Sequence, residues 1–255
     1  MASKSSRSPP KDGTRRPISD GAASDAVRGD SDVPHYHGHR QRLRQRFAAG
    51  GADALPDYEL LELLLFMAIP QRDTKPLAKT LIDTFGSFAD VIAAPAERLM
   101  EVDGVKEGTV AALKIVEAAA LRLAKAKIIG RPALSSWEAL LDYCAASMSR
   151  AQTEEFHVLF LDRKNVLLAE ERHQRGTVDH TPVYPREVVK RALELGASAL
   201  ILVHNHPSGD PTPSRADIAM TREIQAAAKT LKIELHDHLV IGRGKHASFK
   251  ALGLL

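Results

Sequence analysis

The 255-residue chain has a single cysteine, Cys144, and no long hydrophobic run. One thiol cannot form a disulfide framework or supply the thiolates of a zinc finger, and it suits a reducing compartment. No apolar stretch reaches the ~18 residues that a membrane helix needs, and residues 1–30 lack the apolar core of a signal peptide. We therefore expect a cytoplasmic protein without a membrane partner.

The chain also has little excess charge. It carries 35 Lys and Arg against 32 Asp and Glu, a net charge of +3 at pH 7 with neutral histidine. A surplus this small only hints at nucleic-acid contact. With 44% hydrophobic and 26% charged residues, the composition is that of a globular protein, which excludes a fibrous or wholly disordered chain. At roughly 100–200 residues per domain, the length allows one large domain or two small ones.

Residues 1–38 are rich in Ser, Pro, Gly, Asp and Arg and have almost no large apolar side chains. They bury too little surface to offset the entropy of ordering, so we expect a disordered tail. The histidines at 35, 37 and 39 would bind metal only adventitiously. Residues 40–46 carry arginine at every second position, which predicts a basic helix whose charges fan around its axis. This basic segment is either a solvated helix end or a contact for nucleic-acid phosphates.

Residues 39–127 are predicted to form a small helical domain. Leucines at 60, 61, 64 and 65 make a core stripe, with Asp57 at the N-cap position and Pro70 at the end. The remaining pattern predicts further helices at about 74–84, 86–93, 95–101 and 106–126.

The segment 99–110 contains a tight apolar–Gly–apolar turn at Gly104 between two of these helices. A helix-hairpin-helix uses such a turn to direct backbone amides at a nucleic-acid phosphate. Lys106 stands where such hairpins usually carry a second glycine, which puts close backbone approach in doubt and adds a lysine contact. A hairpin that only packs the domain is the alternative.

Residues 127–135 contain Gly130 and Pro132 and are expected to be a linker to a second domain at 133–255. Strands and helices alternate in this second domain, which predicts an α/β fold with a sheet covered on both faces. Helices are predicted at 137–148, 185–195 and 215–231, and strands at 155–162, 165–174, 197–203 and 233–241.

Three metal-ligand side chains follow the apolar strand that ends at Val203. His204 and His206 are two residues apart, so an extended strand places both imidazoles on one face. A loop rich in Pro and Gly then leads to a helix, and Asp217 lies in its first turn. Two imidazoles and one carboxylate, with water as the fourth ligand, form an open zinc site of the catalytic type.

Ser214 has two interpretations. Ser214-x-x-Asp217 matches the capping box that begins many helices, and this alone explains both residues. The full pattern, however, is His-x-His, seven residues, Ser, two residues and Asp, at a strand–loop–helix junction where open α/β sheets place their sites. Ser214 is therefore expected to serve as both cap and catalytic residue.

This spacing resembles the JAMM metalloprotease motif of MPN domains, and the wider sequence resembles the RadC family of bacterial proteins. The stretches that carry the resemblance are Asp57–Phe66, Asp73–Ala78, Pro185–Val188 and His204–Ser214. The resemblance implies an MPN fold, which is a cytidine-deaminase-like α/β sheet with flanking helices, preceded by a small all-α domain like a helix-hairpin-helix.

The resemblance also implies roles for individual residues. His204, His206 and Asp217 would hold one zinc ion per chain, and Ser214 would help to stabilise the oxyanion. The general base of JAMM enzymes is a glutamate on an upstream strand, and Glu155, at the start of an apolar strand, is our choice. Its neighbour Glu154 and the more distant Glu187 compete for the role. We interpret Glu187 as first-turn helix charge.

The second histidine pair, His236 and His238, is also spaced for one strand face. No nearby carboxylate stands at helical spacing, so we expect these residues to brace the sheet by hydrogen bonds and not to bind metal.

The expected activity is zinc-dependent hydrolysis of an amide bond in a peptide or isopeptide, with a peptide or protein as substrate. One alternative is a DNA-associated protein, linked to repair or recombination, that contacts nucleic acid through residues 40–46 and 99–110 and keeps a structural or vestigial metal site. Another is a zinc nuclease, to which a single metal is less suited than a pair.

Overall fold

The computed structural model describes residues 35–133, 135–175 and 183–255. The expected disordered tail lies outside these residues as far as residue 34. Helix α1 (His35–Gly50) begins at His35, earlier than the residue 39 expected for the first domain. Of the helices in the described ranges, none has the length and apolarity that crossing a bilayer requires.

The N-terminal part is helical, as expected, and is connected by short turns. Leu61 and Leu65 of α2 are fully buried and form the centre of its core together with Leu81, Leu99 and Leu113. After α1 and the short 3-10 turn η1 (Ala52–Ala54), the elements are α2 (Asp57–Ala68), α3 (Lys75–Phe85), α4 (Phe88–Ala93), α5 (Ala96–Met100) and α6 (Glu107–Ala126).

One capping prediction in this part is wrong. Asp57 is the first residue of α2 and not its N-cap, which is Pro56. Its carboxylate instead accepts a hydrogen bond from the backbone N–H of Phe88 at 2.9 Å, at the start of α4. The Asp57 side chain thus pairs with a backbone amide of a different helix. The spacing of residues around Asp57 does not reveal this contact.

The C-terminal part is an α/β domain, as predicted. The five strands in its described residues have the order β2-β1-β3-β4-β5. Strand β1 pairs antiparallel with β2 and β3, β3 runs parallel to β4, and β5 pairs antiparallel with β4. The elements are α7 (Trp137–Met148), β1 (Glu155–Leu161), β2 (Leu167–Arg175), α8 (Pro185–Glu194), β3 (Ala199–Asn205), α9 (Arg215–Thr230), β4 (Glu234–Ile241) and β5 (His246–Ser248).

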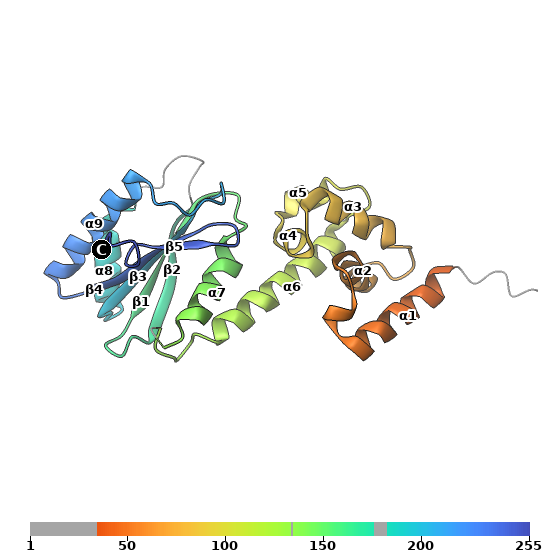
Figure 1. The fold of residues 1–255 in the computed structure, drawn as a ribbon, viewed down its shortest axis with the longest axis horizontal. Helices are drawn as coiled ribbons and strands as arrows, with labels where there is room; N and C mark the ends of the chain where they lie inside the picture. Colours follow the sequence, from red (N-terminus) through yellow and green to blue (C-terminus); the bar gives the residue numbers. More distant parts are fainter. Residues whose placement is uncertain (1–34, 134, 176–182) are drawn as a thin grey trace, which may run out of the picture.

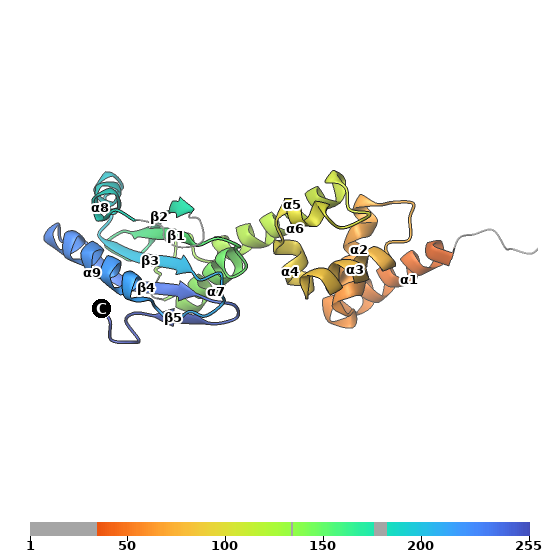
Figure 2. The same cartoon turned by 90° about the horizontal axis from the view of Figure 1, so that it is seen from above.

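Helices cover both faces of this sheet (Figure 2). Phe156, Val158 and Leu202 point to one face and pack in a core with residues of α8 and α9. Leu159 and Val203 point to the other face and pack against α7. Because side chains alternate along a strand, this division assigns a face to every residue of β1 and β3.

Two residues of the predicted linker at 127–135, Ile128 and Ala133, pack against the α/β domain. Ile128 is only 2% exposed and belongs to the core beneath α7. Ala133 donates its N–H to the carbonyl of Asn165 at 2.7 Å. The second core therefore includes the end of α6, and α6 connects the two parts of the molecule (Figure 1).

Candidate metal centre

Strand β3 and helix α9 bring the three predicted ligands together. His204 lies near the end of β3, and the N–H of His206 donates to the carbonyl of Ile241 at 2.9 Å, which continues the pairing with β4 beyond the strand end. The two imidazoles therefore share a face, with ring centroids 4.8 Å apart. Asp217 is the third residue of α9 and faces both rings.

The distances between these side chains fit one metal ion. The Nε2 atoms of His204 and His206 are 3.0 Å apart. Each lies 3.5 Å from a carboxylate oxygen of Asp217, His204 from Oδ1 and His206 from Oδ2. Ligands at ~2.0–2.1 Å in a tetrahedron are ~3.3 Å from one another. The donor set and its spacing thus match a tetrahedral site with one position left for water.

A hydrogen bond at Nδ1 of His206 determines which of its two ring nitrogens can bind a metal. Its Nδ1 lies 2.8 Å from the carbonyl oxygen of Asp210. A carbonyl only accepts, so Nδ1 carries the proton and Nε2 presents its lone pair to the cluster.

A buried chain of hydrogen bonds fixes the His204 ring in the same way. Thr221 Oγ1 donates to the carbonyl of Asp217 at 2.5 Å and therefore accepts from Nδ1 of His238 at 2.6 Å. His238 Nε2 is then unprotonated and accepts from Nδ1 of His204 at 2.8 Å. Burial, and next the charge of His204, hold the pKa of His238 well below its usual value, in keeping with a neutral ring. His204 is left with Nε2 as its ligand atom.

The capping box predicted for Ser214 is present. Its Oγ accepts from the N–H of Asp217 at 3.1 Å, and its own N–H donates to Asp217 Oδ2 at 2.6 Å. Burial alone would raise the pKa of Asp217, but the neighbouring His204 and His206 and the hydrogen bond from Ser214 N–H hold it well below its usual range. The carboxylate is thus ionised and rigidly placed. Participation of the Ser214 hydroxyl in oxyanion binding stays a prediction.

The loop between His206 and α9 is held by close contact with the turn after β4. Gly209, at φ 86°, donates to the carbonyl of His206 at 2.9 Å, and its own carbonyl accepts from the N–H of Arg243 at 3.1 Å. A Cβ on Gly242 would lie only 2.4 Å from the Gly209 oxygen. Only glycine therefore fits at position 242 with this loop in place.

The carboxylate of Glu155, the predicted general base, lies on the other side of the sheet from His204. Phe156 stacks on His204 with ring centroids 6.3 Å apart. Both side chains therefore lie on the same face of the sheet, which we call the metal face. Glu155 precedes Phe156 by one residue and therefore points to the opposite face. Its carboxylate oxygens lie 3.4 Å from His157 Nε2 and 3.4 Å from Arg172 Nη1.

Glu154 precedes β1 and has the parity of Phe156, which favours the metal face. The pKa of His206 is raised mainly by its hydrogen bond to Asp217, and the charge of Glu154 also raises it. Glu187 lies in the first turn of α8, as expected, and is about half exposed. The role of general base stays a prediction, for which Glu154 has the better position.

The second histidine pair braces the sheet, as expected. His238 supports His204 as described above, and His236 Nε2 lies 2.6 Å from the side-chain oxygen of Asn165. Thr221, which completes the His238 chain, was not identified from the sequence. Its position four residues after Asp217, on the same helix face, was the available signal.

The basic segment 40–46 is partly used within the protein. Arg40 is buried and donates to the carbonyls of Ile69 and Arg72 at 2.7 and 2.5 Å. Arg46 pairs with Glu59 at 2.8 Å, whereas Arg42 and Arg44 are exposed. His39, assigned to the tail, instead lies in α1 with Nε2 3.0 Å from Glu62.

The second predicted contact for nucleic acid, residues 99–110, forms a helical hairpin between α5 and α6. Gly104 has φ 88° in its turn, and Lys106 is exposed. Binding of nucleic acid by either segment stays a prediction.

Comparison with known proteins identifies similar chains. The model of the RadC-like JAB domain family matches residues 134–254, which include all three predicted ligands. A UPF0758 protein of Rhodobacter capsulatus is 68% identical over 213 residues, covering 84% of this chain and 100% of the relative. A UPF0758 protein of Ruegeria pomeroyi is 61% identical over 224 residues, covering 88% of this chain and 100% of the relative. Neither name states an activity.

Proposed function

The chain belongs to the RadC family of JAB-domain proteins, and from this membership we propose that it is a zinc-dependent hydrolase of the JAMM type that cleaves an amide bond in a peptide or isopeptide. The observation that carries the proposal is the convergence of His204, His206 and Asp217 within 4.8 Å of one another. Both imidazoles have their Nδ1 atoms engaged elsewhere, so their Nε2 lone pairs are left for the metal.

These residues fit zinc better than a hard cation. Two imidazole nitrogens and one carboxylate are the donor set of many catalytic zinc sites, whereas Mg²⁺ and Ca²⁺ select oxygen ligands. When bound, zinc supplies a Lewis acid and lowers the pKa of a water molecule toward ~7. His204 is fully buried and His206 is partly exposed, so solvent and substrate approach from the His206 side.

The remaining chemistry belongs to side chains around the three ligands. A glutamate oxygen accepts the proton of the attacking water and returns it to the leaving nitrogen. The hydroxyl of Ser214 accepts a hydrogen bond from Asp217 N–H through its lone pair, which leaves its own hydrogen to donate to the carbonyl oxygen as that oxygen gains charge.

We assign the base to Glu154 in preference to Glu155. Glu155 begins the apolar strand, but its carboxylate is engaged with His157 and Arg172. Glu154 has the strand parity of the metal face, and its charge acts on His206. A general base must lie within ~2.6–3.2 Å of the proton it removes, so the face of the sheet decides between neighbours.

Elemental analysis followed by a cleavage assay tests this proposal. We expect one zinc per chain in the purified protein and much less in Asp217→Ala. The zinc-loaded protein should cleave members of a peptide library, while chelator-treated protein and Asp217→Ala should not. Equal zinc in both proteins would contradict the ligand assignment. Absence of cleavage at full zinc loading would contradict the hydrolase.

A further inference from the structure

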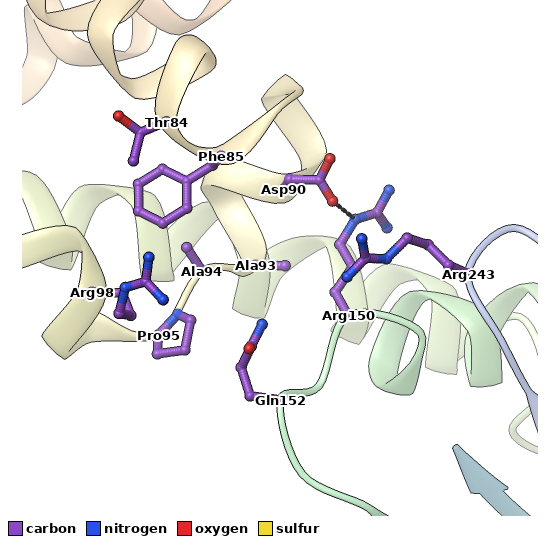
Figure 3. A pocket seen from close by; sticks show the side chains of 10 residues that line it. All are labelled: Thr84, Phe85, Asp90, Ala93, Ala94, Pro95, Arg98, Arg150, Gln152 and Arg243. Carbon is purple, nitrogen blue, oxygen red and sulfur yellow. Dashed lines mark hydrogen bonds and ion pairs between the residues drawn. The ribbon is translucent and has the colours of Figure 1, made fainter. Parts of the chain in front are cut away.

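A cavity of about 170 Å³ lies between the helical part and the α/β domain. Figure 3 shows Arg98 at one end and Arg150 and Arg243 at the other, beside Asp90. The arginines come from separate elements, α5, the turn after α7, and the turn after β4. Phe85 and the segment Ala93–Pro95 form the wall on the helical side.

The cavity has more positive than negative charge. Asp90 is the one carboxylate among its lining residues, and Arg150 Nε donates to it at 2.8 Å. Arg98 pairs with Glu101 at 3.1 Å, but both side chains are more than half exposed, so this pair is weak. The charge of Arg243 also acts on Asp90. The lining thus has three guanidinium groups and one carboxylate, an excess of positive charge for an entering anion.

Two short connections lead from the cavity lining to segments of the metal centre. The backbone N–H of Arg243 donates to the carbonyl of Gly209, in the loop that follows His206. Gln152, another lining residue, lies two positions before Glu154, on the segment that leads into β1. A ligand in the cavity therefore contacts the segment that leads to Glu154 and the turn that holds the loop after His206.

We propose that this cavity binds the carboxylate of an acidic residue in the peptide substrate, beside the bond to be cleaved. The inference rests on the proposed hydrolase function and names a substrate class for it. A volume of about 170 Å³ equals about six water molecules at ≈30 Å³ each, which accommodates one acidic side chain. Guanidinium groups bind carboxylates through paired N–H donors, which gives selectivity as well as affinity.

Fluorescence anisotropy with a labelled hexaglutamate peptide tests the site without depending on hydrolysis. The full chain is titrated at low ionic strength, as wild type and with Asp217→Ala, and hexalysine serves as the control peptide. Arg243→Glu places a negative charge at the cavity, and Arg98→Glu does so at its opposite end. Arg222→Glu is the matched control, because Arg222 is exposed on α9 and does not line the cavity. Thermal melting confirms that each variant is folded.

We expect Arg243→Glu and Arg98→Glu to raise the Kd for hexaglutamate by about tenfold, because a like charge now faces the ligand. Arg222→Glu should leave the Kd unchanged. Equal affinity of Arg243→Glu and wild type would overturn the site. Binding of a single-stranded oligonucleotide that depends on Arg243, without binding of hexaglutamate, would also overturn it in favour of nucleic acid. Binding that depends on Arg243, with no cleavage at full zinc loading, would contradict the hydrolase and leave the anion site standing.

Discussion

His238 Nε2 accepts a hydrogen bond from His204 Nδ1 at 2.8 Å, across the parallel pairing of β4 with β3. The bond is fully buried and continues through Thr221 to the carbonyl of Asp217. One ligand of the candidate metal centre is thus connected to the backbone of another by a chain of three hydrogen bonds. The orientation of His204 depends on residues outside the candidate ligand set.

Removal of His238 should therefore weaken zinc binding. We expect His238→Ala to lower the affinity by about 10–100-fold, the range for loss of a group that orients a metal ligand. Thr221→Val keeps the side-chain shape, removes the hydroxyl and should cause a smaller loss. Competition with a chromophoric chelator measures both. His236→Ala, on the same strand but bonded to Asn165, is the control. Unchanged affinity in His238→Ala would refute the orienting role.

The two neighbouring glutamates should behave differently on conversion to glutamine. Glu154→Gln removes the basic oxygen and should lower hydrolysis by about 10²–10⁴-fold with zinc content unchanged. Glu155→Gln should change turnover little, because its carboxylate lies with His157 and Arg172. Glu187→Gln serves as a second control. The relevant measurement is turnover at equal zinc loading. A larger loss in Glu155→Gln would return the role of base to Glu155.

A methyl group at position 242 should disturb the loop between His206 and α9. The Cβ of Gly242→Ala would lie 2.4 Å from the carbonyl oxygen of Gly209 and 2.9 Å from Pro211 Cδ, so the backbone must shift. We expect a loss of about 1–3 kcal/mol in the free energy of unfolding, together with weaker zinc binding. Gly108→Ala, where a Cβ on α6 meets nothing within 4 Å, should not destabilise. Denaturant unfolding compares the two, and equal stability would show that the loop is free to move.

Glu170 should make the stability of the α/β domain dependent on pH. Burial alone would raise its pKa, but hydrogen bonds from His157, Lys125 and Tyr143 lower it to about 2 from 4.5. The carboxylate therefore contributes stability that is fully present above pH 4.5 and is lost as pH falls toward 2.

The lowered pKa of Glu170 corresponds to roughly 3 kcal/mol at neutral pH. We expect Glu170→Gln to lose stability of this order near pH 7 and to show a flatter pH profile below pH 4.5. Trp137, the single tryptophan, lies on α7 and reports unfolding of this domain by its fluorescence. If the stability of wild type and of Glu170→Gln fell in parallel with pH, the assignment of this pH dependence to Glu170 would be contradicted.

The convergence of His204, His206 and Asp217 was predictable because it depends on local patterns. His204 and His206 follow from strand alternation, and Asp217 follows from the helix that Ser214 begins. The bond between His238 and His204 joins residues 34 apart in the sequence and depends on the register of two parallel strands, which no local pattern specifies.

Other features were not predictable for different physical reasons. Glu154 and Glu155 differ by a single residue, and a shift of one residue reverses the face of a strand. The three-residue strand β5 is too short to show a period. The segment after α6 contains glycine and proline, which indicate a linker, yet Ile128 within it is buried against the sheet.

The length of helix α6 determines how the two hydrophobic cores are placed relative to each other. Leu113 near its start belongs to the helical core, while Ala124 near its end packs with the α/β core. At about 1.5 Å and 100° per residue, each residue added to or removed from its middle changes both the spacing and the twist between the two cores. The number of residues in α6 therefore determines whether Arg98 and Arg243 line the same cavity.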